Sequence, residues 1–188
     1  MSADPGTGPD LKLRLASRAD LPALRLLIPR SVRGLSQSDY SPAQIEASIV
    51  HVFGPDTQLI ADGTYFVIEA GGRIVACGGW SKRRTLYGGD QTKGDADPLV
   101  DPAREPARIR AFFVDPDFSR RGLGSRLMDA CLDAARRAGF KTLELGATLP
   151  GVPLYRSYGF RELERVDVPM PGGEVLPIVR MGRPLEVE

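Results

Sequence analysis

The chain has 188 residues, of which 42% are hydrophobic and 26% are charged, a composition typical of an ordinary globular domain. Its 25 Lys and Arg residues nearly balance 24 Asp and Glu residues, and the resulting net charge of +1 argues against a general nucleic-acid or membrane-surface binder. No apolar run approaches the roughly 20 residues that a membrane-spanning helix needs.

Residues 1–10, MSADPGTGPD, are typical of a loose polar tail and lack the basic and apolar segments of a signal peptide. We therefore expect a cytoplasmic protein with a single domain over residues 11–188. Cys77 and Cys131 are expected to be reduced and buried, and no zinc-ligand spacing is present. His51 is the only histidine and has no nucleophile-elbow motif beside it, so the sequence does not favour a Ser-His-Asp triad.

The first predicted elements are a strand and a helix. Residues 11–15, LKLRL, alternate apolar and polar side chains, which predicts a strand with one wet face. A helix with apolar residues at helical spacing follows, capped by Ser17 or Asp20. Pro29 and Gly34 predict that this helix frays or bends near its end.

A second, short helix and a hairpin come next. Ser41 is the expected N-cap of this helix, with Pro42 in its first turn. Residues 64–80 contain two β-rich runs around the turn AGGR, which indicates a β-hairpin.

Residues 81–106 lose all periodicity and are rich in Gly, Pro, Asp and charge. This loop is longer than the ~12–15 residues of most ordered connections, so it is expected to be functional or disordered. A mobile, solvated loop is the favoured interpretation, and a lid over a substrate site is the alternative.

The second half of the chain predicts a strand–helix–strand unit and three further elements. The expected ranges are a strand at 107–114, a helix from about Leu123 to Gly139, a strand at 141–148, a short helix ending at Gly159, and strands at 161–169 and 175–185. A strand–helix–strand unit requires a right-handed parallel crossover, whereas the hairpins require antiparallel pairs. The predicted fold class is thus α/β of the α+β type, with a mixed, mostly antiparallel sheet and helices on both faces.

The loop SRRGLGSRL, residues 119–127, predicts an anion site between a strand and an amphipathic helix. Gly122 and Gly124 allow close approach of a ligand to the backbone, and the N–H groups of the first helical turn favour phosphate. Arg120, Arg121 and Arg126 add positive charge. A dinucleotide fingerprint would need a third glycine where Leu127 stands, and a P-loop would need Gly-Lys-Ser/Thr, so neither motif is present.

The segment FFVDPDFSRRGLGSRLMDACLDAARRAGF, followed by LYRSYGF, resembles the GNAT-type N-acetyltransferases, which use acetyl-CoA. The family motif is Gln/Arg-x-x-Gly-x-Gly/Ala after a strand ending in Val-x-Pro, with Leu-Tyr-x-x-x-Gly-Phe one strand later. Here residues 114–116 match Val-x-Pro, Gly122 and Gly124 match the glycines, and residues 154–160 match the last segment. The resemblance implies a GNAT-like acyl-CoA N-acyltransferase fold and acetyl-CoA as cosubstrate.

The resemblance also implies roles for individual residues. The backbone amide of Val114 would polarise the thioester carbonyl, and Tyr155 would protonate the departing thiolate. The backbone of residues 112–114 would pair with the pantetheine arm, and the glycine loop would hold the pyrophosphate. The implied cofactor-binding residues are Phe112, Phe113, Val114, Arg120, Arg121, Gly122, Leu123, Gly124, Ser125, Tyr155 and Tyr158, with a packing role favoured for the Tyr158 side chain.

Two positions depart from the family pattern. Ser119 stands where Gln or Arg is usual, which should remove one side-chain contact but leave the backbone cradle. Arg108 stands at the expected position of a Glu that often acts as a base through water. The general base is therefore unassigned. Glu144 and Glu69 are candidates, although an exposed strand carboxylate without a catalytic role is the more common case for such residues.

These observations predict an N-acetyltransferase that moves an acetyl group from acetyl-CoA to a primary amine by direct attack. A small-molecule acceptor is favoured over a peptide amine, with no nucleic acid, membrane or metal involved, and a homodimer is left open. The residues expected to line the acceptor pocket are Arg30, Tyr40, Trp80 and Glu144, with a core or loop-anchoring role favoured for Trp80. The alternative function is a non-catalytic acyl-CoA binding or sensing module.

Overall fold

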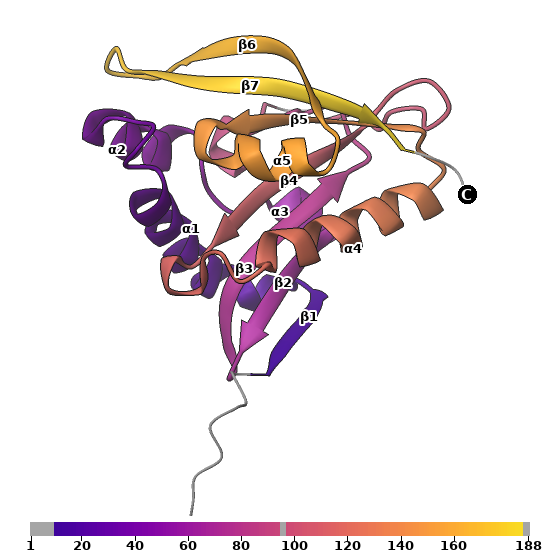
Figure 1. Cartoon of the computed structure of the whole chain (residues 1–188), viewed down its shortest axis with the longest axis horizontal. Coiled ribbons are helices and arrows are strands. Elements are labelled where there is room, and N and C mark those ends of the chain that lie inside the picture. Colours follow the sequence, from indigo (N-terminus) through magenta and orange to yellow (C-terminus); the bar gives the residue numbers. More distant parts are fainter. Residues whose placement is uncertain (1–9, 95–96, 186–188) are drawn as a thin grey trace, which may run out of the picture.

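The structure is a computed structural model that describes residues 10–94 and 97–185, so nearly all of the expected N-terminal tail lies outside the described residues. Seven strands form one sheet in the order β1-β2-β3-β4-β5-β7-β6 (Figure 1). Only the β4–β5 pair is parallel, which confirms the mixed, mostly antiparallel sheet. The strands are β1 (Leu11–Leu15), β2 (Tyr65–Ala70), β3 (Arg73–Ser81), β4 (Ala107–Val114), β5 (Thr142–Thr148), β6 (Arg161–Pro169) and β7 (Val175–Pro184).

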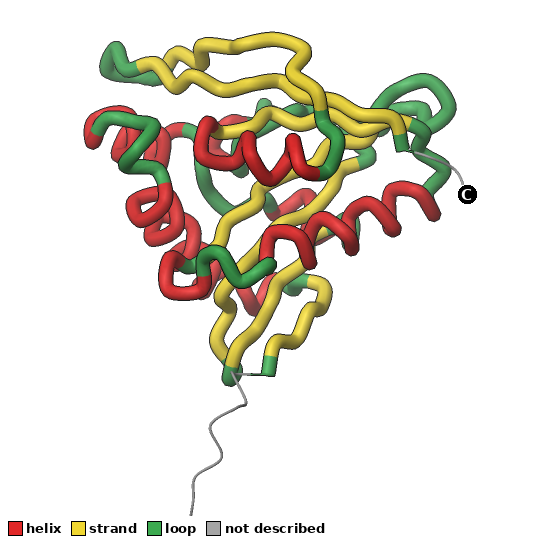
Figure 2. The backbone as a smooth tube through the Cα atoms, in the orientation of Figure 1, coloured by secondary structure: helices red, strands yellow, loops and turns green. Residues whose placement is uncertain are grey.

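Helices cover both faces of the sheet, as the tube in Figure 2 makes plain. Those on one face share a hydrophobic cluster with β2 and β3, and those on the other bury their apolar side chains against β3, β4 and β5. The first group is α1 (Leu21–Leu35), α2 (Pro42–His51) and α3 (Thr57–Ala61), and the second is α4 (Leu123–Arg137) and α5 (Val152–Ser157). Short 3₁₀ turns span Arg18–Asp20, Asp90–Thr92, Pro116–Phe118 and Leu149–Gly151.

The N-terminal helices follow local signals in part. Ser41 caps α2 and shares a capping box with Gln44, as its sequence position predicts. By contrast, α1 continues through Pro29 to Leu35, because its buried apolar stripe outweighs the hydrogen bond that proline removes. Gly34 has a different role: a Cβ there would lie 2.3 Å from Cγ of Pro116, so this glycine lets α1 pack against the turn after β4.

The sheet opens between β4 and β5. These strands pair only at Ala107–Leu143 and Arg108–Glu144, although β4 continues to Val114 and β5 to Thr148. A bulge in β4, where Ala111 has a φ of 55°, interrupts the pairing with β3 at the same level. The two central strands therefore diverge and leave a V-shaped opening bordered by unpaired strand edges.

The described part of the loop 81–106 is hydrogen-bonded to the rest of the molecule. The Arg83 guanidinium donates to both carboxylate oxygens of Asp62, at 2.7 and 3.0 Å. The Thr57 amide and hydroxyl donate to Asp90, and the Gly89 amide donates to the carbonyl of Val52. These contacts favour a fixed wall over the solvated loop expected from composition.

Both cysteines are free and buried, as predicted, and burial raises the pKa of the Cys77 thiol to about 12. Within residues 10–94 and 97–185, no helix is long and apolar enough to cross a bilayer. The same residues contain no group of three or more His, Cys, Asp or Glu side chains suited to a metal ion.

Candidate active site

A cavity of about 430 Å³ occupies the opening between β4 and β5. One side is formed by the end of α1, the segment after α2 and the loop after β3, and the other by β4, β5, α5 and the glycine loop. The described residues that line it are 31, 32, 35, 36, 53, 54, 86–89, 109–114, 119, 120, 124, 146, 148, 150, 151, 154 and 155.

The glycine loop carries a run of unpartnered amides at the N-terminus of α4. The backbone N–H groups of residues 120–125 donate to no described residue, whereas the Arg126 amide donates to the carbonyl of Gly122. Arg120 and Gly122 both have left-handed backbones, with φ of 58° and 76°. A non-glycine residue in this region is strained, a feature that is common at ligand sites. The helix end thus offers several donors and a positive dipole to an anion.

The β4 segment brings Phe112 and Val114 to the opening. A Cβ on Gly78 would lie 2.4 Å from the Phe112 ring, so this glycine is what allows the ring to cross β3. The Val114 amide, the expected oxyanion donor, donates to Oγ of Ser31 at 3.1 Å. The Ser31 hydroxyl oxygen therefore occupies the place where the carbonyl oxygen of a bound thioester would accept the hydrogen bond from Val114. The hydroxyl proton of Ser31 has no acceptor among the described residues.

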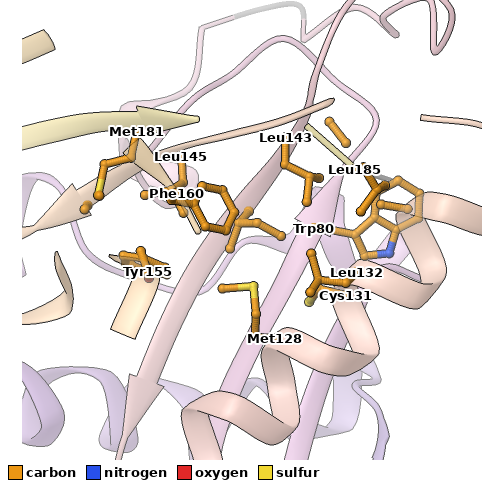
Figure 3. Close-up of a cluster of buried hydrophobic side chains, with 14 of the residues drawn as sticks. Trp80, Met128, Cys131, Leu132, Leu143, Leu145, Tyr155, Phe160, Met181 and Leu185 are labelled. Carbon is orange, nitrogen blue, oxygen red and sulfur yellow. The ribbon is translucent and has the colours of Figure 1, made fainter. Parts of the chain in front are cut away.

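Tyr155 stands on α5 with its ring in the hydrophobic core (Figure 3). The residue also lines the cavity. The ring lies 6.3 Å from that of Phe112 and 6.0 Å from that of Phe160. A Cβ on Gly151 would come within 3.0 Å of it. Burial raises the pKa of the phenol well above its usual value, so Tyr155 stays protonated near neutral pH. Its hydroxyl has no hydrogen-bond partner in the described part of the chain, which leaves the proton available to a ligand.

The other residues expected to bind the cofactor divide by position. Arg120 and Gly124 line the cavity, whereas the side chain of Leu123 is buried in the core. The Arg121 guanidinium lies 5.0 Å from the centre of the Phe118 ring. Phe113 also lines the cavity, whereas Arg121, Gly122 and Ser125 are not among the described lining residues.

The Tyr158 side chain connects two helices. Its hydroxyl donates to Asp129 at 2.8 Å and to the carbonyl of Ser125 at 3.0 Å. Together these bonds tie α5 to the first turns of α4 and steady the glycine loop.

Two of the four expected acceptor residues have structural partners outside the cavity. Arg30 pairs with Asp117 at 2.7 Å and lies within 3.3 Å of Asp115, in a separate surface groove. The Tyr40 hydroxyl donates to the carbonyl of Pro177 and accepts from the amide of Leu149, and burial raises its pKa to about 12. Neither side chain reaches the space between β4 and β5.

The other two also lie outside the cavity walls. Trp80 lies in the core (Figure 3). Its ring centroid is 5.9 Å from that of Phe140. Glu144 accepts from Arg108 at 3.0 Å and from Arg180 at 3.0 and 3.1 Å. Because Arg108 and Glu144 form the last paired position of β4 and β5, their ion pair closes the apex of the opening.

The acceptor side of the cavity is built from residues that the sequence does not single out. Val32, Leu35, Phe53, Leu86 and Tyr87 provide a mostly apolar wall from three separate segments. Each is an ordinary apolar or aromatic residue with no motif around it, and only the folded chain brings them together.

A buried ion pair holds this wall in place. The Arg110 guanidinium donates to Asp56 at 3.0 Å and to the carbonyls of Thr85 and Gly88. Asp56 also pairs with Lys93 and accepts from the first amides of α3. The N-cap role of Asp56 in a short helix is a local signal that the sequence offers. The ion pair has no such signal, because its partner Arg110 lies 54 positions away.

Residues 31–160 match the family model described as the acetyltransferase (GNAT) family. The chain belongs to this family. All described cavity-lining residues fall within the GNAT match, from Ser31 at its first position to Tyr155 near its end. The sequence resemblance to the family is therefore confirmed over a region that includes the whole site.

This GNAT chain is similar in sequence or fold to several proteins named as N-acetyltransferases. An uncharacterized N-acetyltransferase of Methanocaldococcus jannaschii is 39% identical over 66 residues, which is 34% of this chain and 29% of that protein. A GCN5-related N-acetyltransferase of Rhodopseudomonas palustris superposes with a TM-score of 0.67 at 22% identity, covering 98% of this chain and 100% of the other. The PaiA N-acetyltransferase of Thermoplasma acidophilum, solved with coenzyme A, gives 0.63 at 12% identity and 93% and 99% coverage.

The ribosomal-protein-S18-alanine N-acetyltransferase of Escherichia coli gives a TM-score of 0.60 at 20% identity, with 95% and 96% coverage. These likenesses establish the fold. The chain spans less than a third of the length of the curated M. jannaschii relative.

Proposed function

We propose that residues 11–188 form one acetyltransferase domain that moves an acetyl group from acetyl-CoA to a primary amine. The observation that carries this proposal is the run of unpartnered amides at residues 120–125, which leads directly to a cavity lined by Tyr155. A phosphate group needs the first feature and a departing thiolate needs the second. Membership of the GNAT family supports pairing them in one reaction.

The residues present fit coenzyme A. The amides around Gly122 offer donors for a pyrophosphate, and Arg120 adds a positive charge on the cavity wall. The free edge of β4 beyond Arg108 offers backbone groups to an extended amide-containing arm, as an added strand would use them. Ser119 does not weaken this cradle, because the donors belong to the main chain.

The chemistry follows from the position of Tyr155. A neutral amine attacks the thioester carbonyl carbon, and the collapse of the tetrahedral intermediate breaks the carbon–sulfur bond. The Tyr155 hydroxyl donates its proton to the sulfur as the bond breaks. The Val114 amide and the Ser31 hydroxyl lie together at the cavity wall, where donors would stabilise the developing oxyanion.

A small-molecule amine remains the favoured acceptor, because the acceptor side is a cavity between α1 and the loop after β3 and not an extended groove. A peptide amine is the second candidate, and the E. coli structural neighbour is named for an alanine of a ribosomal protein. The cytoplasmic location and the homodimer stay predictions from sequence.

A non-catalytic acyl-CoA sensor is the alternative function. The observation that favours it is Arg108, which stands at the expected place of a base and is paired with Glu144. A sensor would keep the cradle and the cavity but would release no thiol.

Thiol release separates the two functions. The purified chain is incubated with acetyl-CoA and a panel of small amines and peptides, and free thiol is followed with a chromogenic reagent. The acetyltransferase predicts amine-dependent thiol release and an acetylated product of matching mass. Tight binding of coenzyme A, measured by calorimetry, without turnover of any amine would instead support the sensor.

A further inference from the structure

The cavity wall has an unusual set of polar side chains. Among the described residues that line it, the polar side chains carry only hydroxyl or guanidinium groups: Ser31, Ser36, Tyr87, Arg110, Ser119, Arg120, Thr148 and Tyr155. No carboxylate, imidazole, thiol or lysine amine is among these lining residues. A guanidinium cannot accept a proton, and serine and threonine hydroxyls do not do so near neutral pH.

The carboxylate behind the acceptor wall is fully engaged. Asp56 accepts from Arg110, from Lys93 and from the amides of Gln58 and Leu59. Its side chain has no exposed surface. It is therefore closed to both an acceptor amine and a relaying water.

The carboxylate at the apex of the opening is engaged as well. Glu144 is held by two arginines, Arg108 and Arg180. Tyr87 covers the next same-face position along β5, because a Cβ on Gly146 would lie 3.3 Å from its Cδ1 atom. Glu144 therefore stands behind an aromatic side chain instead of in the cavity.

Tyr155 is also unsuited to take a proton first. Burial raises its pKa, so the phenolate that could act as a base is scarce near neutral pH. The hydroxyl can pass a proton on only when it receives another in the same step.

The acceptor side also disfavours additional positive charge on the ligand. Its wall is formed by Val32, Leu35, Phe53 and Leu86, and Arg110 contributes the charge on this side. Asp56 is paired with two cations, Arg110 and Lys93, so its carboxylate is not free for a further cation. A second ammonium group on the acceptor would lose its hydration against an apolar wall whose described lining residues include no carboxylate.

We propose that this site takes its acceptor already neutral and so selects small, apolar amines of low basicity that carry no second cationic group. The inference rests on the proposed acetyltransferase function and names its substrate class. The reaction balances without a base on the enzyme other than Tyr155, which exchanges one proton for another. The nitrogen lone pair forms the carbon–nitrogen bond, the carbon–sulfur bond breaks, Tyr155 gives its proton to sulfur, and the phenol regains the proton that nitrogen loses.

The size of the expected selection follows from acid–base equilibria. At pH 7 an amine with a pKa of about 8, typical of a peptide α-amino group, is about 10% neutral. A lysine-like alkylamine with a pKa of about 10.4 is about 0.04% neutral. If only the neutral form reacts, kcat/KM at pH 7 differs by about 200-fold between amines of similar shape.

A matched pair of acceptors tests this. Phenylalaninamide and phenethylamine share the same aromatic body, but the first has an α-amino group and the second a strongly basic alkylamine. Thiol release is measured from pH 6 to 9 with acetyl-CoA in excess. We expect kcat/KM for phenethylamine to rise tenfold per pH unit throughout, and that for phenylalaninamide to level near pH 8. Glu144→Gln should leave both pH profiles unchanged.

Several other results would contradict this inference. One inflection shared by both amines would reveal a base on the enzyme, as would the loss of the pH dependence in Glu144→Gln. Preference for spermidine over both aromatic amines would also overturn the inference while leaving the acetyltransferase proposal intact. If no amine in the panel releases thiol at any pH, the proposed function and this inference both fail.

Discussion

The buried pair between Asp56 and Arg110 should control both the stability of the domain and the shape of the acceptor wall. The two side chains are 0% and 1% exposed and 3.0 Å apart. Asp56 also caps α3, and Arg110 binds the carbonyls of Thr85 and Gly88. The change to test is Asp56→Ala, which leaves Arg110 buried without its partner.

The expected loss is large. Removing one partner of a buried ion pair costs about 3–5 kcal/mol, because the remaining charge is not solvated. Loss of the N-cap adds about 1 kcal/mol. The sum of about 4–6 kcal/mol is comparable to the whole stability of many domains, which is about 5–15 kcal/mol. Asp56→Asn is the milder companion, because asparagine retains the cap and removes only the charge.

Urea unfolding followed by circular dichroism measures the effect. The matched control is Glu46→Ala, which removes an exposed pair with Arg33 of similar geometry, at 2.7 and 2.8 Å, and should leave the midpoint almost unchanged. The two Asp56 variants should also speed protease cleavage within the loop 81–106 in native buffer. A loss below about 1 kcal/mol in Asp56→Ala would show that the pair is solvated and refute this account.

Three further outcomes are expected. Tyr155→Phe should lower kcat by about 100-fold or more, with little change in coenzyme A affinity by calorimetry; equal turnover would remove Tyr155 from the reaction. Gly122→Ala should cost about 1–2 kcal/mol in urea unfolding, because φ is 76° there, and Gly94→Ala is the unstrained control. Arg14 holds the pKa of Asp20 at about 2, below 3.8, so stability should fall as pH drops from about 4 towards 2. Asp20→Asn should flatten that decline.

Much of the fold could be predicted because its signals are local. Alternating or apolar runs gave all seven strands, and Ser41 with Pro42 marked the start of α2. The parallel β4–β5 pair follows from the handedness of strand–helix–strand connections. The short helix α3 was missed, because five residues carry too little periodicity to stand out.

The two sides of the site differ in how far sequence could locate them. The cofactor side lies within the contiguous segment from Phe112 to Ser125, where strand, turn and helix start follow one another. The acceptor side joins Ser31, Phe53 and Tyr87 with β5, and these segments meet only after the sheet has opened. No spacing rule relates them, which is why a residue chosen for its chemistry, such as Arg30, lies elsewhere.

This difference has a physical consequence for how the site can change. The pyrophosphate cradle depends on main-chain amides and two residues with left-handed backbones. The presence of Ser119 in place of Gln or Arg therefore leaves the hydrogen-bond donors of the cradle in place. The acceptor wall depends on apolar side chains whose position is set by the buried pair of Asp56 and Arg110. Substitutions at Phe53 or Tyr87 can therefore reshape the pocket while the pair keeps the loop anchored, and acceptor choice can vary separately from the grip on coenzyme A.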